Sequence, residues 1–453
     1  MPNQITSYWN LHRFPILILL ACSIFYYFFA YHQERTDFIR LITLFAALFF
    51  LCYKLIQFEK WNFRFLLFAG ILFRLVFLIA EPNLSQDYFR FIWDGQLVLH
   101  GINPYLYLPD DLILQSDLAV ANAQQLHSGM GDLSARHFSN YPPLNQLLFS
   151  LAAYLGGKSV LGTVISMRVI IALADIGIFY FGRKLLKQLN CSPHLIFWYF
   201  LNPLVIIELT GNLHFEGVML FFFIWSMYLL SQHKWVLAAL VYGLSIGVKL
   251  VPLMFLPLFL KHFKLRKSIS FYALVGAICL IQMLPFYSPQ FIDNYSETIG
   301  LWFSNFEFNA SIYNLIKKVA IQFDAKPWEL IKTYGKITPY ITVAIVMLVT
   351  AFRKNQDMVI LFGSMLLILT SYYFLSATVH PWYIIFLILL SIYTNFRFPL
   401  FWSAVVILSY SAYMNPDYSE NLALLLIEYL IVFGFLVYEI IRLKGQKLLF
   451  HKN

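Results

Sequence analysis

The sequence predicts an all-α polytopic membrane protein. Of its 453 residues, 60% are hydrophobic and only 12% are charged, whereas soluble domains are usually about half apolar and about a quarter charged. Apolar runs of about 18 or more residues recur along the chain, and each could cross a hydrocarbon core about 30 Å thick as a helix. The alternating strands of about ten residues that build a lipid-facing barrel are not seen. Because lipid offers no partner for open backbone groups, helices are the expected spanning elements.

The apolar runs predict about 12 to 14 membrane crossings. The candidate spans are 13–31, 37–57, 63–80, 162–182, 194–211, 216–231, 270–287, 337–352, 358–376, 380–395, 398–414 and 421–441. A further stretch, 235–261, is interrupted by Lys249 and Pro252, and we expect it to form two short helices because proline breaks a helix interior. We expect one membrane domain over 1–453, with two long loops at 81–142 and 288–336.

Basic residues predict which side of the membrane each loop faces. Under the positive-inside rule, the clusters at 183–187, 261–267, 353–354 and 442–447 belong in the cytoplasm. Counting crossings back from these clusters places both long loops on the outer side. This orientation requires that 143–157 does not cross, so we predict a re-entrant or interfacial helix there. The net charge of +9 therefore reflects topology, and no nucleic-acid partner is expected.

The first long loop opens with two carboxylates that are candidates for catalysis. Asp87 and Asp94 are seven residues apart, which puts them on one face if the segment is helical, with Arg90 between them. A carboxylate at the membrane surface can act as a general base for a hydroxyl acceptor. The alternative is a solvated helix end that carries an ordinary Asp–Arg pair, and the spacing alone does not decide between the two.

Three further outer-side motifs carry polar groups, which are expensive near lipid and therefore informative. His214 and Glu216 occupy a short turn after Asn212 and could bind a phosphate or steer a sugar, or they could be ordinary turn residues. His380 begins a predicted span, where a helix N-terminus suits an anion, although histidine is also a common interfacial anchor. Lys249 at the helix break could pair with a phosphate or extend to the interface.

Two charged residues lie inside a predicted span. Arg168 and Asp175 are two turns apart within 162–182, and either could shape a cavity or satisfy a neighbouring helix. The P-loop, GxGxxG, GxSxG and HExxH motifs are absent from the sequence. Because the candidate groups are external and sugar nucleotides are cytoplasmic, any activated substrate is expected to arrive within the membrane.

The polar motifs follow one another in a characteristic order. The blocks are Ser85-Gln86-Asp87-Tyr88, Trp93-Asp94-Gly95, Gly101-Ile102-Asn103-Pro104-Tyr105, Tyr141-Pro142-Pro143-Leu144, Met167-Arg168, Ala174-Asp175, Asn202-Pro203-Leu204, Gly211-Asn212, His214-Phe215-Glu216, Lys249-Leu250 and His380-Pro381-Trp382-Tyr383. This order resembles the polyprenol-phosphate-sugar-dependent glycosyltransferases of the GT-C class, and most closely the bacterial polyprenyl-phosphomannose-dependent mannosyltransferases. The likeness covers 63–395. Two predicted N-terminal spans precede it, and the resemblance gives them no role.

The resemblance implies a GT-C-type fold and an inverting transfer of a sugar, mannose, from a polyprenyl phosphate to an acceptor hydroxyl. It puts the catalytic carboxylate at Asp87, with Asp94 as the second candidate. It makes His380, Lys249 and Arg90 candidates for binding the donor phosphate, since charge-assisted hydrogen bonds stabilise a departing phosphate. The remaining candidates are expected to line the sugar or acceptor cavity: His214, Glu216, Asn212, Tyr141, Arg168 and Asp175.

The resemblance also sets expectations for metal, partners and location. Many relatives carry two adjacent acidic residues at the catalytic position, whereas this chain has Gln86 before Asp87, so we expect no metal and no other cofactor. The expected partners are the lipid-linked donor, the bilayer, and a glycan, glycolipid or protein acceptor. The expected location is the bacterial inner membrane, with the active site on its outer face. The sequence does not name the sugar, the acceptor or the linkage.

Two other functions stay open at this point. A transporter or flippase of lipid-linked sugar would usually show internal repeats and mid-membrane broken helices, and no repeat is found in the sequence. A glycan polymerase or ligase that uses a polyprenyl diphosphate would need more outer-side arginines for its second phosphate. Few arginines occur in the predicted outer loops.

Overall fold

The fold is a bundle of helices, seen here in a computed structural model that describes residues 4–450. The side chains of 4–8, 302–304 and 444–450 lie outside the described residues, and the last of these segments holds part of the predicted basic cluster at 442–447. Within the described residues the only extended pairing is an isolated parallel bridge between Phe308 and Thr378. The predicted all-α class is therefore confirmed.

Seven helices of the described chain are long and apolar enough to cross a membrane. The candidate spans in these helices are Trp9–His32, Phe38–Glu59, Val160–Gln188, Leu265–Phe286, Pro327–Phe352, Met358–Leu375 and Leu422–Leu443. An eighth span is formed if Pro193–Phe200 and Pro203–Gly211, which meet at 53°, count as one. The chain is therefore a multi-pass membrane protein. The other predicted spans are shorter apolar helices, so fewer helices meet the length requirement than the 12 to 14 crossings predicted.

The N-terminal third begins with three helices, α1 (Gln4–His32), α2 (Phe38–Glu59) and α3 (Phe63–Val76). The side chain of Asp37 caps α2 by accepting a hydrogen bond from the backbone N–H of Arg40, and Asn62 caps α3 in the same way. α1 and α2 pack against each other as a hairpin. The loop between them therefore lies at the same end of the bundle as the segment that follows α3.

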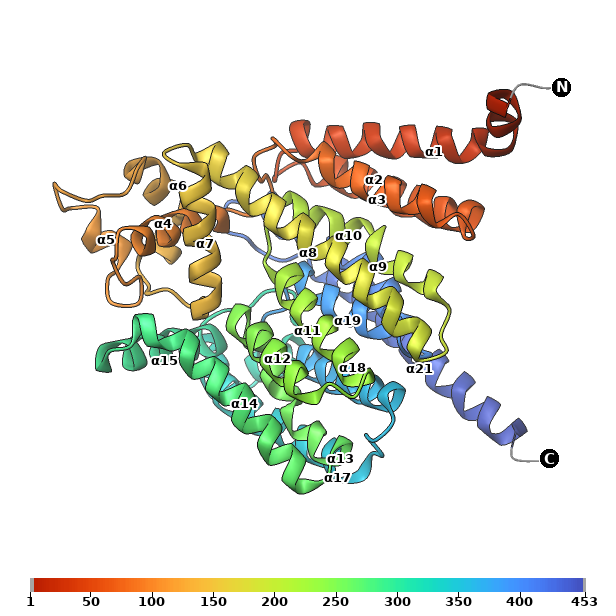
Figure 1. Cartoon of the computed structure of the whole chain (residues 1–453). Coiled ribbons are helices and arrows are strands. Elements are labelled where there is room, and N and C mark those ends of the chain that lie inside the picture. Colours follow the sequence, from red (N-terminus) through yellow and green to blue (C-terminus); the bar gives the residue numbers. More distant parts are fainter. Residues whose placement is uncertain (1–3, 451–453) are drawn as a thin grey trace.

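The first long loop and the segment that follows it fold into four helices at one end of the bundle, at the left in Figure 1. These are α4 (Asp87–Leu99), α5 (Pro109–Leu112), α6 (Ala123–Ala135) and α7 (Pro143–Gly156). α4 and α7 cross so closely that a Cβ on Gly95 would lie 2.4 Å from the carbonyl oxygen of Phe149. α7 has 14 residues, or about 21 Å at 1.5 Å per residue. This length agrees with a helix that does not cross fully.

The middle of the chain contains short and bent helices. It runs through α8 (Val160–Gln188), η1 (Pro193–Ile196), α9 (Phe197–Phe200), α10 (Pro203–Val205), the π-helical turn η2 (Ile206–Gly211), α11 (Glu216–Ser231), α12 (Trp235–Val248), η3 (Val251–Leu258) and α13 (Phe259–His262). The stretch 235–261 is interrupted at Lys249, as predicted. π-Helical turns are frequent at functional sites, and η2 ends immediately before the turn at 212–215.

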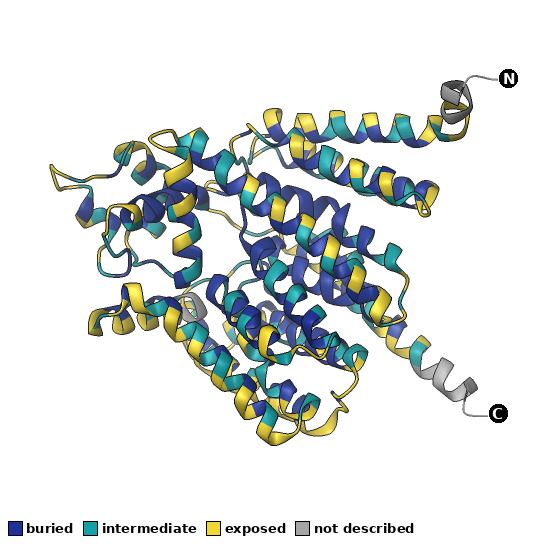
Figure 2. Ribbon diagram, viewed as in Figure 1, coloured by how far each residue is buried: buried dark blue, intermediate teal, exposed yellow. Residues whose placement is uncertain are grey.

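The C-terminal half completes the bundle. Its elements are α14 (Leu265–Met283), η4 (Leu284–Phe286), α15 (Pro289–Ser304), α16 (Ile312–Ile321), α17 (Pro327–Phe352), α18 (Met358–Leu375), η5 (Pro381–Tyr383), α19 (Ile384–Ser391), α20 (Phe398–Val405), η6 (Val406–Met414) and α21 (Leu422–Phe450). Figure 2 shows buried residues concentrated in the middle, around α11 and α19, while α1, α2 and α14 show exposed stripes. Such stripes on apolar helices are expected where helices face lipid.

Candidate active site

One cavity of about 460 Å³ lies where the first long loop meets the C-terminal half. Its wall draws on the α1–α2 loop, α4, α6, the segment 137–142, the helix break after α12, and parts of α15, α17, α18, η5 and η6. Five of the residues singled out in the sequence line it: Asp87, Arg90, Tyr141, Lys249 and His380. Segments nearly three hundred residues apart thus supply the polar groups of one site.

Asp87 is the first residue of α4, and its half-buried side chain lies on the cavity wall. Its backbone N–H donates to the hydroxyl of Ser85 at 3.3 Å, which fixes the entry to the helix. Burial raises the pKa of the Asp87 carboxyl, and Glu216 adds to this rise, while Lys249, Arg35 and a hydrogen bond with Ser85 oppose it. A carboxylate with a raised pKa is a stronger proton acceptor, which suits a general base.

Asp94 does not face the cavity with Asp87, although their seven-residue spacing predicted that both lie on one helix face. It is fully buried, it pairs with the Nε of Arg90 at 2.7 Å, and it accepts from Ser139 Oγ at 2.6 Å and Gln146 Nε2 at 3.1 Å. Asp94 is absent from the described cavity wall, because the second turn of α4 packs against α7 while its first turn opens into the cavity. In this structure Asp94 holds Arg90 and the segment 137–142 in place, and this position does not favour its predicted role as a second catalytic group.

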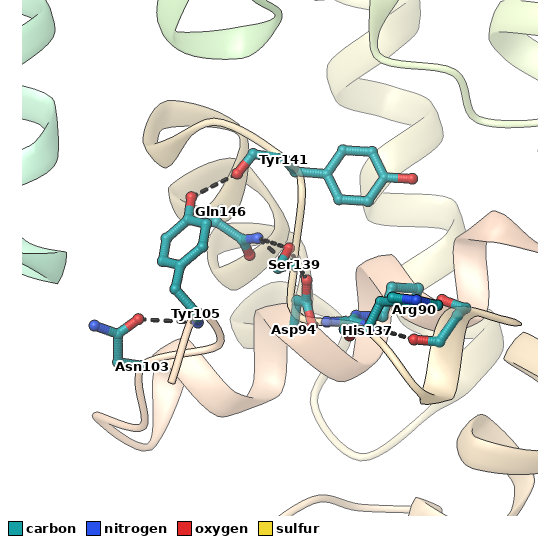
Figure 3. A network of polar contacts seen from close by, with 9 residues as sticks. Arg90, Asp94, Asn103, Tyr105, His137, Ser139, Tyr141 and Gln146 are labelled. Carbon is teal, nitrogen blue, oxygen red and sulfur yellow. Dashed lines mark hydrogen bonds and ion pairs between the residues drawn. The ribbon is translucent and has the colours of Figure 1, made fainter. Parts of the chain in front are cut away.

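Arg90 and Tyr141 connect that buried network to the cavity. The Nη1 of Arg90 donates to the backbone oxygens of Ser134 at 2.6 Å and His137 at 3.0 Å. The backbone oxygen of Tyr141 accepts from the hydroxyl of Tyr105, while its ring points away from the Asp94 network (Figure 3). Arg90 therefore has most of its hydrogen-bonding capacity engaged, which makes it a poor candidate for a phosphate ligand.

Lys249 forms a close ion pair at the bottom of the site. Its Nζ lies 2.6 Å from the carboxylate of Glu216, the first residue of α11. The backbone of Lys249 is extended (φ −148°, ψ 141°), because the chain leaves α12 there before η3 begins at Val251. Glu216 is not itself on the cavity wall but neutralises the lysine that is.

Two histidines enclose a tryptophan beside the cavity. The ring of Trp382 stacks on His214 at 3.8 Å between centroids and on His380 at 4.4 Å, with interplanar angles of 19° and 3°. Burial lowers the pKa of His380 to about 3, helped by the positive charges of Lys249 and Arg35. Burial also lowers the pKa of His214 well below its usual value. Both rings are therefore neutral near pH 7, and each can donate only one N–H.

The remaining predicted cavity residues support the site from behind. The amide of Asn212 donates to Glu208 at 3.0 Å and accepts from the backbone N–H of Leu84 at 3.3 Å, which anchors the segment before Asp87. Neither Asn212 nor His214 is on the described cavity wall. Between them Leu213 adopts a positive φ of 64°, a strained conformation for a branched residue. The conformation of the turn at 212–215 is therefore maintained by tertiary contacts and not by the backbone preference of Leu213.

Arg168 and Asp175 were expected to shape the sugar or acceptor cavity, and this expectation is wrong. Both are buried within the bundle and absent from the cavity wall. The guanidinium of Arg168 donates to the backbone oxygens of Thr210 at 2.7 Å and Leu78 at 2.8 Å. Asp175 pairs with Arg74 at 2.9 Å. These contacts satisfy open carbonyls and a buried charge, so the two residues tie α8 to α3 and η2.

Arg35 lies in the loop between α1 and α2 and lines the same cavity, although it was not predicted from the sequence. Its guanidinium carbon lies 3.6 Å from the ring centroid of Tyr413. No sequence motif marks Arg35, because it lies in a short polar loop between two apolar spans. The only signal in the sequence was that Arg35 is a charged residue near the outer-side ends of two predicted spans.

Comparison with known proteins identifies the family. Residues 32–263, slightly more than half of the chain, match the family described as alpha-(1→6)-mannopyranosyltransferase, N-terminal domain. The chain belongs to this family. It is therefore a glycosyltransferase of a mannosyltransferase family, and the predicted GT-C resemblance and enzymatic nature are confirmed. Among curated proteins, no match to the chain was found.

The matched part of this mannosyltransferase does not contain the whole cavity. It includes Arg35, Asp87 and Lys249 but ends before His380 and Tyr413. The second half of the chain therefore completes the site. Within the described residues, no group of three or more His, Cys, Asp or Glu side chains is arranged to hold a metal ion.

Proposed function

We propose that this enzyme transfers mannose from a polyprenyl-phosphate donor to an acceptor hydroxyl, with Asp87 as the general base. The observation that carries the proposal is the shared cavity: one half-buried carboxylate of raised pKa, three cations and a neutral histidine face a single space. A donor of this kind needs both a base near the acceptor and positive charge near its phosphate.

In the proposed reaction, the acceptor oxygen attacks C1 of the mannosyl group from the face opposite the phosphate. The O–H proton passes to Asp87 as the new C1–O bond forms. The bond between C1 and the phosphate oxygen breaks, and its electron pair leaves with the polyprenyl phosphate. The configuration at C1 inverts. Since the family is named for an α-(1→6) linkage, an inverting enzyme would take a β-linked donor and use a primary 6-hydroxyl of the acceptor.

The wall of the cavity away from α4 supports a lipid-borne donor. Ile299 of α15, Tyr334, Gly335 and Thr338 of α17, and Tyr372 of α18 line it. α17 continues past these residues with exposed Tyr340 and Val343, and it is one of the helices apolar enough to span a membrane. A polyprenyl tail can therefore leave the cavity between these helices while its phosphate stays inside.

We further propose that the cavity opens on the outer face of a bacterial inner membrane. Two of the basic clusters lie near each other, since Lys261 donates to the backbone oxygen of Ala351 at 2.9 Å, just before the cluster 353–354. A third cluster, 183–187, lies in the C-terminal part of α8, which runs away from α4–α7 in Figure 1. The positive-inside rule then assigns the opposite end, with the cavity, to the outer side.

The test is transfer by the purified protein in lipid nanodiscs. Polyprenyl-phospho-mannose and a soluble mannoside with a free 6-hydroxyl are supplied, and the product linkage is read by NMR. We expect a new α-(1→6) bond and free polyprenyl phosphate. Transfer from a polyprenyl-diphosphate sugar, but not from the monophosphate, would instead favour the polymerase or ligase reaction. Absence of transfer from either donor, with a folded protein, would refute the proposal.

A further inference from the structure

The cavity is lined by three cations, Arg35, Arg90 and Lys249. Arg90 is paired with Asp94 at 2.7 Å, and Lys249 with Glu216 at 2.6 Å. Among the described residues, no carboxylate forms an ion pair with Arg35, and its Nε is buried without a hydrogen-bond partner. A buried donor left unsatisfied costs about 1–3 kcal/mol, so this atom is best explained by a partner that arrives with a ligand.

Arg35 is held in position by aromatic contacts. Its guanidinium lies over the ring of Tyr413, which stacks on Phe308 at 5.9 Å, and Phe308 in turn stacks on His380 at 4.9 Å. Phe308 is fixed by backbone hydrogen bonds with Ala377 and Val379 at 2.9 and 2.8 Å. Arg35 and His380 therefore belong to one continuous stack on a single wall of the cavity.

The loop that carries Arg35 is tied to the segment that carries Asp87. The side chain of Gln33 donates to the backbone oxygens of Glu34 and Asp37 at 2.7 and 2.8 Å. Asn83 donates to the backbone oxygens of Phe29 and Gln33 at 2.7 and 3.1 Å. Such bonds fix the loop relative to the start of α4. The fold therefore fixes the position of Arg35 before any ligand binds.

His380 offers a second donor on the same wall of the cavity as Arg35. Its Nδ1 is buried and has no hydrogen-bond partner among the described residues. Because its ring is neutral near pH 7, it supplies a hydrogen bond without charge. The wall therefore presents one cation that forms no ion pair among the described residues, and one neutral donor. A phosphodiester between a sugar and a polyprenol also carries a single negative charge, which increases when the sugar leaves.

We infer that Arg35, on the same cavity wall as His380, binds the phosphate of the polyprenyl donor. This inference rests on the proposed function and names a residue outside the predicted phosphate ligands His380, Lys249 and Arg90. It also gives the N-terminal hairpin of α1 and α2 a role, since this hairpin delivers the cation. Arginine suits the position because its planar fork can donate two parallel hydrogen bonds to a phosphate.

The test measures binding of polyprenyl monophosphate, without sugar, to the full-length protein in phosphatidylcholine nanodiscs. Polyprenol of the same length serves as the phosphate-free probe. Arg35→Ala should weaken binding of the phosphate by about tenfold to a hundredfold and leave binding of the alcohol unchanged. Arg35→Lys should lose less affinity. Arg40→Ala is the matched control, because Arg40 lies in the first turn of α2, directly after the same loop, but is exposed and outside the cavity wall.

The outcomes separate this inference from the proposed function. Equal binding of polyprenyl phosphate by wild type, Arg35→Ala and Arg35→Lys would overturn the role of Arg35 and leave the proposed function standing. Equal affinity of the wild type for polyprenyl phosphate and polyprenol would overturn both. Displacement of the probe by an equal concentration of phosphatidylglycerol would show a general lipid-phosphate site, and this result would overturn the assignment to the donor.

Discussion

The Nζ of Lys249 lies 2.6 Å from the carboxylate of Glu216, across a helix break and 33 residues away in the chain. Both groups act on the proton affinity of Asp87, in opposite directions: Lys249 lowers the pKa of that carboxyl and Glu216 raises it. The pair therefore tunes the proposed base, and it leaves Lys249 with little net charge to offer a phosphate. This contrasts with the role that the position of Lys249 in the sequence suggested.

The first prediction concerns the pH dependence of transfer. If Asp87 is the base, activity requires its ionised form and is lost as pH falls through its pKa. Lys249→Met removes a positive charge and leaves Glu216 unpaired, so both effects raise the pKa of Asp87 and should move the acid limb of kcat/KM to higher pH. Glu216→Gln should move it to lower pH. Shifts of both variants in the same direction would contradict the assignment of this limb to Asp87.

The second prediction concerns Asp87 itself. Asp87→Asn keeps the size of the side chain but cannot accept the acceptor proton, so kcat should fall by about a hundredfold to ten-thousandfold. Binding of polyprenyl phosphate should not weaken, because the asparagine removes a negative charge from the cavity that holds the phosphate. Asp111→Asn is the control, since Asp111 lies exposed on α5 in the same loop. Near-normal turnover by folded Asp87→Asn would refute the proposed base.

Most helices could be predicted from the sequence because the features that produce them are local. Apolar runs and the prolines that interrupt them are visible in the chain itself, so the break at Lys249 and Pro252 and the short helix after Pro142 were expected and are found. The outcome for Asp94 shows the limit of such reasoning. Heptad spacing puts Asp87 and Asp94 on one helix face, but only tertiary contacts reveal that α7 covers the second of them.

Contacts between distant segments were beyond the reach of the sequence. The guanidinium of Arg35 lies over the ring of Tyr413, almost four hundred residues away in the chain. No spacing pattern in the sequence links the two residues. Likewise, Arg168 and Asp175 were placed correctly on one helix but wrongly beside the cavity. A charge within a span is expensive whether it serves catalysis or satisfies a neighbouring carbonyl, so the two roles look alike until their partners are seen.

The third prediction separates the structural role of Asp94 from a catalytic one. Asp94→Ala leaves Arg90 buried without its carboxylate, and breaking a buried pair usually costs about 3–5 kcal/mol. The melting temperature should therefore fall clearly. The matched control is Asp132→Ala, which removes an exposed pair with Arg136 at 3.4 Å; such pairs contribute about 0–1 kcal/mol. An unchanged melting temperature with lost turnover would argue for a direct catalytic role of Asp94.

The fourth prediction is that transfer does not depend on a divalent metal. A bound cation in such a site usually needs two or more carboxylates. Here the residue before Asp87 is Gln86, whose amide donates to the backbone oxygen of Met130 at 3.1 Å, and the nearby carboxylate of Glu216 is held by Lys249. Turnover should therefore survive chelator treatment and should not rise when magnesium or manganese is added.

Gln86→Glu provides a sharper test of the same point. It restores two adjacent acidic residues, so this variant should bind manganese more tightly than the wild type, as measured by electron paramagnetic resonance. The added carboxylate also places a second negative charge beside Asp87, which should raise the pKa of Asp87 and move the acid limb of transfer to higher pH in metal-free buffer. Loss of wild-type activity with chelator, followed by recovery with manganese, would contradict the metal-independent mechanism and would require a ligand set other than the residues that line this cavity.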